Sequence, residues 1–258
     1  MAGDEGAGDH VPGGDAEPET DVQRARIAHQ LVAAVHGQSP DRMPDVLCRA
    51  CTALLPELSG LSVSVTGKDA DAGVVLCASD GVAARLAEIQ YTLGEGPCME
   101  AVRLRAPVFA ADLGSAPDNR RWPLFSMQAA RAGARAAFSV PLTSAGGALG
   151  TLDLYRDAPG SLSADQVRTA LLVADAVTLA VIALDHASAN GDGFVTWLEG
   201  AQADREEVHQ ATGMIMVQLG VSAQEALVRL RARAFAQGRT STEVARDVIG
   251  RTMDLRND

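Results

Sequence analysis

Hydrophobic residues along the first half of the chain recur at helical spacing and then at strand spacing. From about residue 21 to 36 apolar residues lie three or four positions apart, which predicts an amphipathic helix built on Ile27, Leu31, Val32 and Val35. Ser39 and Pro40 then form an N-cap and first-turn pair that predicts a second helix. The alternating residues 61–65, the polar turn 67–71 and the apolar run 73–76 together predict a β-hairpin.

The pattern then returns to helices, strands and one long helix. A helical segment at 82–89 precedes the loop 92–97, and Pro97 is suited to the first turn of another short helix. Further strands are predicted at 107–111, 136–142 and 149–155, and the capping box Ser163-x-x-Gln166 predicts a helix reaching about residue 186. This order predicts an α+β domain over residues 21–188, an antiparallel sheet with flanking helices.

A second domain is predicted after the break at 189–195, which we interpret as a linker. Three capping boxes follow it, and each predicts the start of a helix: Thr196-x-x-Glu199, Ser222-x-x-Glu225 and Thr240-x-x-Glu243. Glycines at 220 and 238 are suited to ending the first two helices. Residues 196–258 are therefore expected to form a small all-α three-helix bundle.

Charge is spread unevenly along this chain of 258 residues, whose formal net charge is −11. Residues 1–20 hold six acids, no Lys or Arg and little to bury, which predicts a disordered acidic tail. The net charge argues against general nucleic-acid binding, but residues 226–242 contain four arginines and no acid. No apolar run is long enough to span a membrane and no signal-peptide pattern opens the chain, so a cytoplasmic protein is expected.

The C-terminal segment 204–249 resembles the ANTAR domain, a three-helix RNA-binding module of bacterial transcription antiterminators. The resemblance includes the step Ala211-Thr212-Gly213, Gly220 after the first helix, and Ala226, Leu230, Arg231 and Ala234 in the second. It implies binding to paired RNA hairpins in nascent transcripts and antitermination, without chemistry. Two hairpins imply two such domains, and therefore a homodimer. The apolar seams of helices 21–36 and 163–186 either form the dimer contact or pack inside the core of the first domain.

The same resemblance implies which residues contact RNA. On one helix Arg231 points about 160° away from Arg229, so the arginines of this stretch do not all face one surface. We assign RNA binding to Arg205, Thr212, Arg231, Arg239, Ser241 and Thr242. Thr212 occupies a position where many members have lysine, so its hydroxyl retains a hydrogen bond to phosphate but loses the charge.

Upstream, several short motifs resemble the GAF domains that precede ANTAR domains in actinobacterial regulators. They include 92–98 (TLGEGPC), 107–112, Trp122-Pro123, 140–142 and 149–155. A GAF domain implies a sensor for a small molecule, which the sequence does not identify. Gly94, Glu95, Gly96 and Cys98 are either the ligand loop or a tight turn before a helix, and Cys98 is either a redox or haem thiolate or a structural thiol.

Neither catalytic nor metal-ligating sets emerge from the remaining polar residues. Cys48-x-x-Cys51 lies in a helical segment without a second ligand pair, and the five histidines are scattered. We therefore expect a regulator and not an enzyme, and no cofactor is specified. Two other functions remain open: a DNA-binding regulator whose helix enters the major groove, and a dimerising protein-interaction module.

Overall fold

A single antiparallel sheet of five strands organises the first domain. The computed structural model describes residues 16–39, 42–66, 73–145, 147–188 and 193–257. The strands pair in the order β2-β1-β5-β4-β3, with bounds β1 Gly60–Thr66, β2 Gly73–Ala78, β3 Val108–Ala110, β4 Ala136–Ser144 and β5 Gly147–Arg156. The predicted hairpin β1–β2 is confirmed, as are the strands predicted at 107–111, 136–142 and 149–155.

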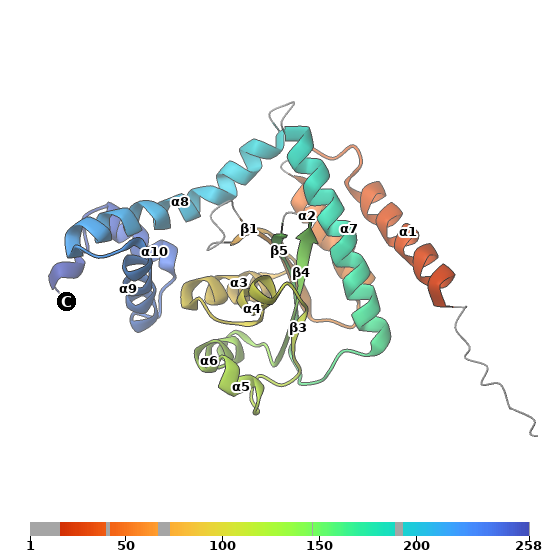
Figure 1. Cartoon of the computed structure of the whole chain (residues 1–258), viewed down its shortest axis with the longest axis horizontal. Coiled ribbons are helices and arrows are strands. Elements are labelled where there is room, and N and C mark those ends of the chain that lie inside the picture. Colours follow the sequence, from red (N-terminus) through yellow and green to blue (C-terminus); the bar gives the residue numbers. More distant parts are fainter. Residues whose placement is uncertain (1–15, 40–41, 67–72, 146, 189–192, 258) are drawn as a thin grey trace, which may run out of the picture.

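One face of the sheet is covered by α1 (Ala16–Val35), α2 (Met43–Leu54) and α7 (Ala164–Ser188). Alternate strand residues such as Leu61, Val63 and Leu152 point into this layer and are fully buried. Figure 1 shows α1 lying along α7 on the outer side. The capping box of α7 is confirmed, because Ser163 and Gln166 exchange side-chain and backbone hydrogen bonds.

The opposite face carries α3 (Gly81–Leu93), α4 (Pro97–Leu104), α5 (Asp118–Arg121) and α6 (Pro123–Ala132). A second core forms there around Phe125 and Trp122. The Asp80 side chain caps α3 by accepting from the amides of Val82 and Ala83, and the Tyr155 hydroxyl of β5 donates to the same carboxylate. The N-terminal end of α3 is thereby attached to the sheet.

Three further helices form the second domain: α8 (Gly193–Leu219), α9 (Ala223–Ala236) and α10 (Ser241–Ile249), followed by the short turn η2 (Leu255–Asn257). Their shared core is built from small and branched side chains, with Ala211, Ile215, Leu230 and Val244 fully buried. The predicted α+β domain followed by a three-helix unit is confirmed. We call α1 to α7 with the sheet the sheet domain, and α8 to α10 the helical domain.

Three boundary predictions and the predicted burial of Val32 are corrected by the structure. The first helix begins at Ala16 and not at 21, and its Val32 is 61% exposed instead of buried. Helix α3 continues to Leu93, so Thr92 and Leu93 are helical and not loop residues. Helix α8 begins at Gly193, so Thr196 lies inside the helix and does not start it. Of the tail predicted at 1–20, residues 16–20 belong to α1, and residues 1–15 lie outside the described residues.

Candidate nucleic-acid interface

Two local caps position the arginine-containing part of the helical domain. Ser222 caps α9 by accepting from the Glu225 amide. At α10 the Thr240 hydroxyl accepts from the Glu243 amide at 3.1 Å, while the Glu243 carboxylate accepts from the Thr240 amide at 2.7 Å. The Thr240 amide bond lowers the pKa of Glu243. The two helix starts and the turn between α9 and α10 are therefore held by the helical domain's own residues.

Arg231, in the middle of α9, faces the sheet domain. Its guanidinium carbon lies 5.4 Å from the centroid of the Tyr91 ring, within the range of a cation–π interaction. Gly94 lies against the same guanidinium, since a β-carbon placed on Gly94 would be 2.8 Å from Nη1 of Arg231. Arg231 thus lies between the helical domain and the C-terminal end of α3.

Ser241 and Thr242, at the start of α10, are buried at 0% and 7% exposure. The Ser241 amide donates to Oγ1 of Thr92 at 3.2 Å, and this bond joins the two domains. A first-turn amide has no acceptor within its own helix, so an oxygen from elsewhere completes it. In the described conformation that oxygen belongs to α3.

Arg239 forms an ion pair within the helical domain. Its Nη1 lies 2.6 Å from the Asp247 carboxylate and its Nη2 donates to the Glu243 carbonyl. The hydrogen bond to Asp247 raises the pKa of Arg239 above its ordinary value. Because both partners are about one-third exposed, the pair orients the guanidinium without removing it from solvent.

The two remaining residues of the predicted RNA site lie on α8. Thr212 is 8% exposed, on the same buried stripe as Val208 and Ile215, and its hydroxyl donates to the Val208 carbonyl at 2.7 Å. Arg205 is placed only as a helical position, because its side chain lies outside the described set. The structure therefore brings Arg231 and Ser241 to the domain contact, with Arg239 lining the groove beside it. Thr242 is buried next to Ser241 at the start of α10, and Thr212 lies in the helical core.

The predicted ligand loop connects three helices through hydrogen bonds. Gly94 ends α3 in the left-handed conformation at φ 67°, and the Cys98 amide donates to the Gln90 side chain at 2.8 Å. The Glu95 carboxylate accepts from the Phe125 amide at 2.7 Å, which completes the first turn of α6. The loop Gly94–Gly96 thus joins α3, α4 and α6, and these contacts favour the tight-turn interpretation over the ligand loop.

A polar strip crosses the sheet beneath α3 and α4. Ser62, Ser139, Thr151 and Asp153 are all buried on neighbouring strands. The Asp153 carboxylate accepts from the Ser139 hydroxyl at 2.6 Å and from the Thr151 hydroxyl at 2.8 Å. Burial nevertheless raises the pKa of Asp153 to about 6, since it disfavours the charged form more than the two hydroxyls stabilise it. This strip is polar chemistry that the sequence patterns did not reveal.

The cysteines show no sign of a reactive or metal-binding arrangement in the part of the chain that the structure describes. Cys48, Cys51 and Cys77 are buried free thiols, and burial raises the pKa of Cys51 to about 12. Hydrogen bonding to Cys48 raises the pKa of Cys77 as well. No group of three metal-ligating side chains is found among the described residues. Among the helices described, none is both long and apolar enough to cross a membrane.

Comparison with protein-family models decides the family. The model of the GAF domain matches residues 41–181, which is more than half of the chain. The chain belongs to the GAF family. A second model, of the ANTAR domain, matches residues 197–249. The sheet domain is accordingly a GAF domain and the helical domain an ANTAR domain, so the predicted combination is confirmed.

Several solved structures are similar to part of this chain at low sequence identity. The GAF domains of the phosphoenolpyruvate-protein phosphotransferases from Coxiella burnetii and Acinetobacter are each 13% identical, with TM-scores of 0.49 and 0.47. They cover 65% and 69% of this chain and 98% and 99% of their own. The free methionine-R-sulfoxide reductase from Neisseria meningitidis, in complex with its substrate, is 14% identical at a TM-score of 0.42, covering 66% of this chain and 92% of its own. A search of curated proteins finds no match.

The GAF and ANTAR families comprise sensor and regulatory domains, so this chain is a signal-responsive regulator of transcription with a GAF sensor and an ANTAR output. Tyr91 and Thr92 of the GAF domain are the residues at the domain contact that sequence reasoning missed. The sequence signals them only through Tyr91, an isolated aromatic residue at the end of an amphipathic segment. An aromatic residue in that position is more typical of a domain's own core than of a contact between domains.

Proposed function

We propose that this regulator binds paired RNA hairpins through its ANTAR domain and acts by transcription antitermination under control of the GAF sensor. The supporting observation is the basic stretch 226–242 within the ANTAR match of an otherwise acidic protein. Arginines are suited to phosphate contacts, and a local basic surface attracts RNA even where the net charge repels it.

The proposed RNA surface consists of Arg205, Thr212, Arg231, Arg239, Ser241 and Thr242. Arg231 and the start of α10 are its centre, because a guanidinium and a first-turn amide together match the phosphate and base of a nucleotide. Thr212 takes part only if its hydroxyl exchanges the Val208 carbonyl for a phosphate oxygen. Arg239 contributes charge at the rim while it remains paired with Asp247.

The proposal is tested by competition between a dual-hairpin RNA and a DNA duplex of equal length for the full chain, followed by Arg231→Ala. We expect RNA to win, and the Arg231→Ala variant to flatten the slope of log affinity against log salt by about one unit because one fewer counterion is released. Arg251→Ala, at an exposed position after α10, is the control and is expected to keep the slope. Both variants are first compared with the wild type by circular dichroism and thermal melting.

Preference for the duplex would replace this function with DNA binding, and binding to neither would leave a protein-interaction module. A folded Arg231→Ala variant with unchanged affinity and salt slope would remove Arg231 from the RNA surface.

We also propose that the regulator is a homodimer through α1 and α7, which would supply the two ANTAR domains that paired hairpins need. Leu171 and Leu179 are 38% and 64% exposed on α7 and lie eight residues apart on one stripe, and Val32 is 61% exposed on α1. We expect a dimer mass by light scattering at micromolar concentration, and a monomer for Leu171→Glu combined with Leu179→Glu. Val217→Glu, at an 86% exposed position on α8, is the control. A wild-type monomer that still binds paired hairpins would contradict this proposal.

The sensor is proposed to respond to a small molecule whose identity the residues do not specify. The tight turn that contains Gly94, Glu95, Gly96 and Cys98 is proposed to transmit that response to the adjoining end of α3 and not to hold the molecule itself. We propose no catalytic step and a cytoplasmic site of action, in keeping with a regulator that meets nascent RNA.

A further inference from the structure

The end of α3 occupies the centre of the proposed RNA surface. Tyr91 is 4% exposed, and its ring packs with the ANTAR core residues and not with either core of the GAF domain. The next residue, Thr92, accepts the Ser241 amide through Oγ1. Two adjacent residues of the sensor therefore contact the two features, Arg231 and the start of α10, on which RNA binding is proposed to depend.

These contacts have the chemistry that a nucleotide would offer. A hydroxyl oxygen fills the position of a phosphate oxygen at a helix start, and an aromatic ring lies under a guanidinium as a base would. Arg231 also lies at the C-terminal end of α3, where the helix dipole attracts a cation. The end of α3 thus satisfies the same donors and the same cation that RNA would satisfy.

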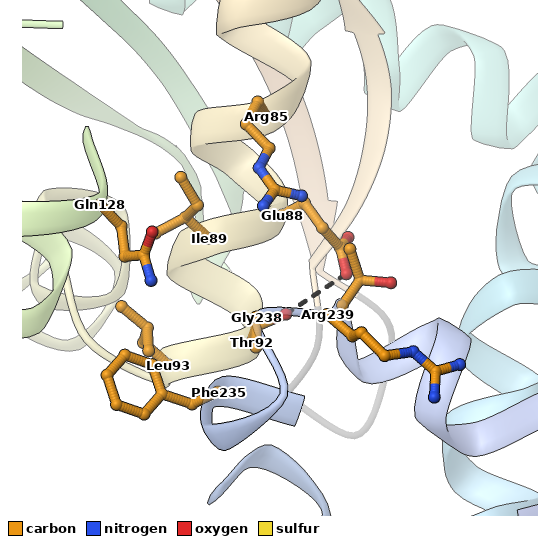
Figure 2. A pocket seen from close by; sticks show the side chains of 10 residues that line it. Arg85, Glu88, Ile89, Thr92, Leu93, Gln128, Phe235, Gly238 and Arg239 are labelled. Atoms are coloured by element: carbon orange, nitrogen blue, oxygen red, sulfur yellow. Dashed lines mark hydrogen bonds between the residues drawn. The ribbon is translucent and has the colours of Figure 1, made fainter. Parts of the chain in front are cut away.

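Beside these contacts the two domains are separated by a groove, which Figure 2 shows between α3 and the turn leading into α10. Arg85, Glu88 and Leu93 line it from the GAF side, and Phe235 and Arg239 line it from the ANTAR side. The pKa of Glu243 is lowered chiefly by its hydrogen bond to the Thr240 amide, and the positive charge of Arg85 lowers it further. At the end of α3 the described residues of the two domains therefore meet through polar and aromatic contacts next to a groove. A contact of this kind opens more readily than a large apolar interface would.

We propose that the end of α3 is an intramolecular competitor of RNA, so that RNA binds the ANTAR domain only when the Tyr91 and Thr92 contacts open. The inference rests on the proposed function, because it assigns the regulation of the same surface. In this arrangement the GAF domain controls output by covering the RNA surface, and the apparent RNA affinity is the intrinsic affinity multiplied by the fraction of molecules that are open.

The test uses the full chain with Thr92→Val, which removes the acceptor with little change in volume, and Tyr91→Leu, which removes the ring and keeps an apolar side chain. Each is expected to tighten binding of a dual-hairpin RNA about threefold, and the double variant about tenfold, because a hydrogen bond or a cation–π contact contributes this much to the closed state. Thr52→Val is the matched control, since its hydroxyl donates to a carbonyl within α2 on the other face of the sheet. It is expected to leave RNA affinity unchanged.

Amide hydrogen exchange reports the contact itself in the absence of RNA. The Ser241 amide has its acceptor on α3, whereas the Glu243 amide is bonded to Thr240 within the ANTAR domain. We expect Ser241 to be protected in the wild type and to exchange faster in Thr92→Val, with Glu243 unchanged as the internal control.

Faster exchange at Ser241 together with tighter RNA binding supports the proposal. Faster exchange with unchanged RNA affinity overturns the competition while leaving RNA binding intact, and an unprotected Ser241 in the wild type overturns the contact. If Thr92→Val opens the contact at Ser241 and neither this variant nor the wild type binds RNA, the proposed RNA-binding function is wrong. The proposed competition is then wrong as well.

Discussion

Truncating Leu230 to alanine is expected to lower the free energy of unfolding of the ANTAR domain by about 3 kcal/mol, because removing a fully buried leucine loses apolar contacts and leaves a cavity. Leu230 is 0% exposed at the centre of the α8–α10 core, one residue before Arg231. Urea unfolding followed by circular dichroism measures the change. We expect RNA binding to fall with it at temperatures where the variant is partly unfolded.

Val228→Ala on the same helix is the control, since Val228 is 56% exposed and its loss should change stability by no more than about 0.5 kcal/mol. Equal effects of the two substitutions would mean that α9 does not pack on α8 and α10 through the face containing Leu230.

Replacing Asp153 with asparagine is expected to stabilise the GAF domain by about 2 kcal/mol at pH 7, because it removes a buried charge while keeping the shape of the side chain. The folded pKa is raised to about 6, against about 3.9 in an unfolded chain. The stability that this group contributes is therefore fully present below about pH 4 and is lost as the pH rises to about 6. Ser139 and Thr151, which donate to the carboxylate, can rotate their hydroxyls to accept from the amide.

The measurement is the difference in unfolding free energy between Asp153→Asn and wild type at pH 4, 5, 6 and 7, which we expect to grow from near zero to its full value. Asp175→Asn, at a 63% exposed side chain on α7, should show no such trend. If Asp153→Asn is instead less stable than the wild type by the same amount at every pH, the prediction is wrong. The bonds from Ser139 and Thr151 would then require the two oxygens of Asp153, whether it is charged or protonated.

Local patterns predicted the elements of this fold well and their long-range contacts poorly. The alternation at 61–65 predicted β1, but nothing local indicates that β1 pairs with β5, about ninety residues later in the sequence. The capping boxes at Ser163 and Thr240 are confirmed, whereas the one at Thr196 is wrong, because a Thr-x-x-Glu pattern also occurs within a helix that has already begun.

The candidate site was also hard to predict, because its burial depends on contacts between residues far apart in the sequence. Ser241 was expected at an accessible helix start, and its burial depends on Thr92, which lies 149 positions earlier in the sequence. Thr212 was expected to face phosphate, yet it falls on the buried stripe of α8, where the back-bond to Val208 satisfies its hydroxyl. Neither result follows from residue type or helical period, because both depend on which element lies opposite.

The four thiols of this protein differ in burial, so one of them is suited to selective labelling of the native chain. Cys48, Cys51 and Cys77 are buried in the core of the GAF domain, where a thiol reaches alkylating reagents only when the domain unfolds. Cys98 is the more accessible thiol, and its own amide is bonded to Gln90, the residue immediately before Tyr91. A fluorophore attached to the native chain under mild conditions therefore labels the start of α4, beside the end of α3 that contacts the ANTAR domain, without any cysteine having to be added or removed.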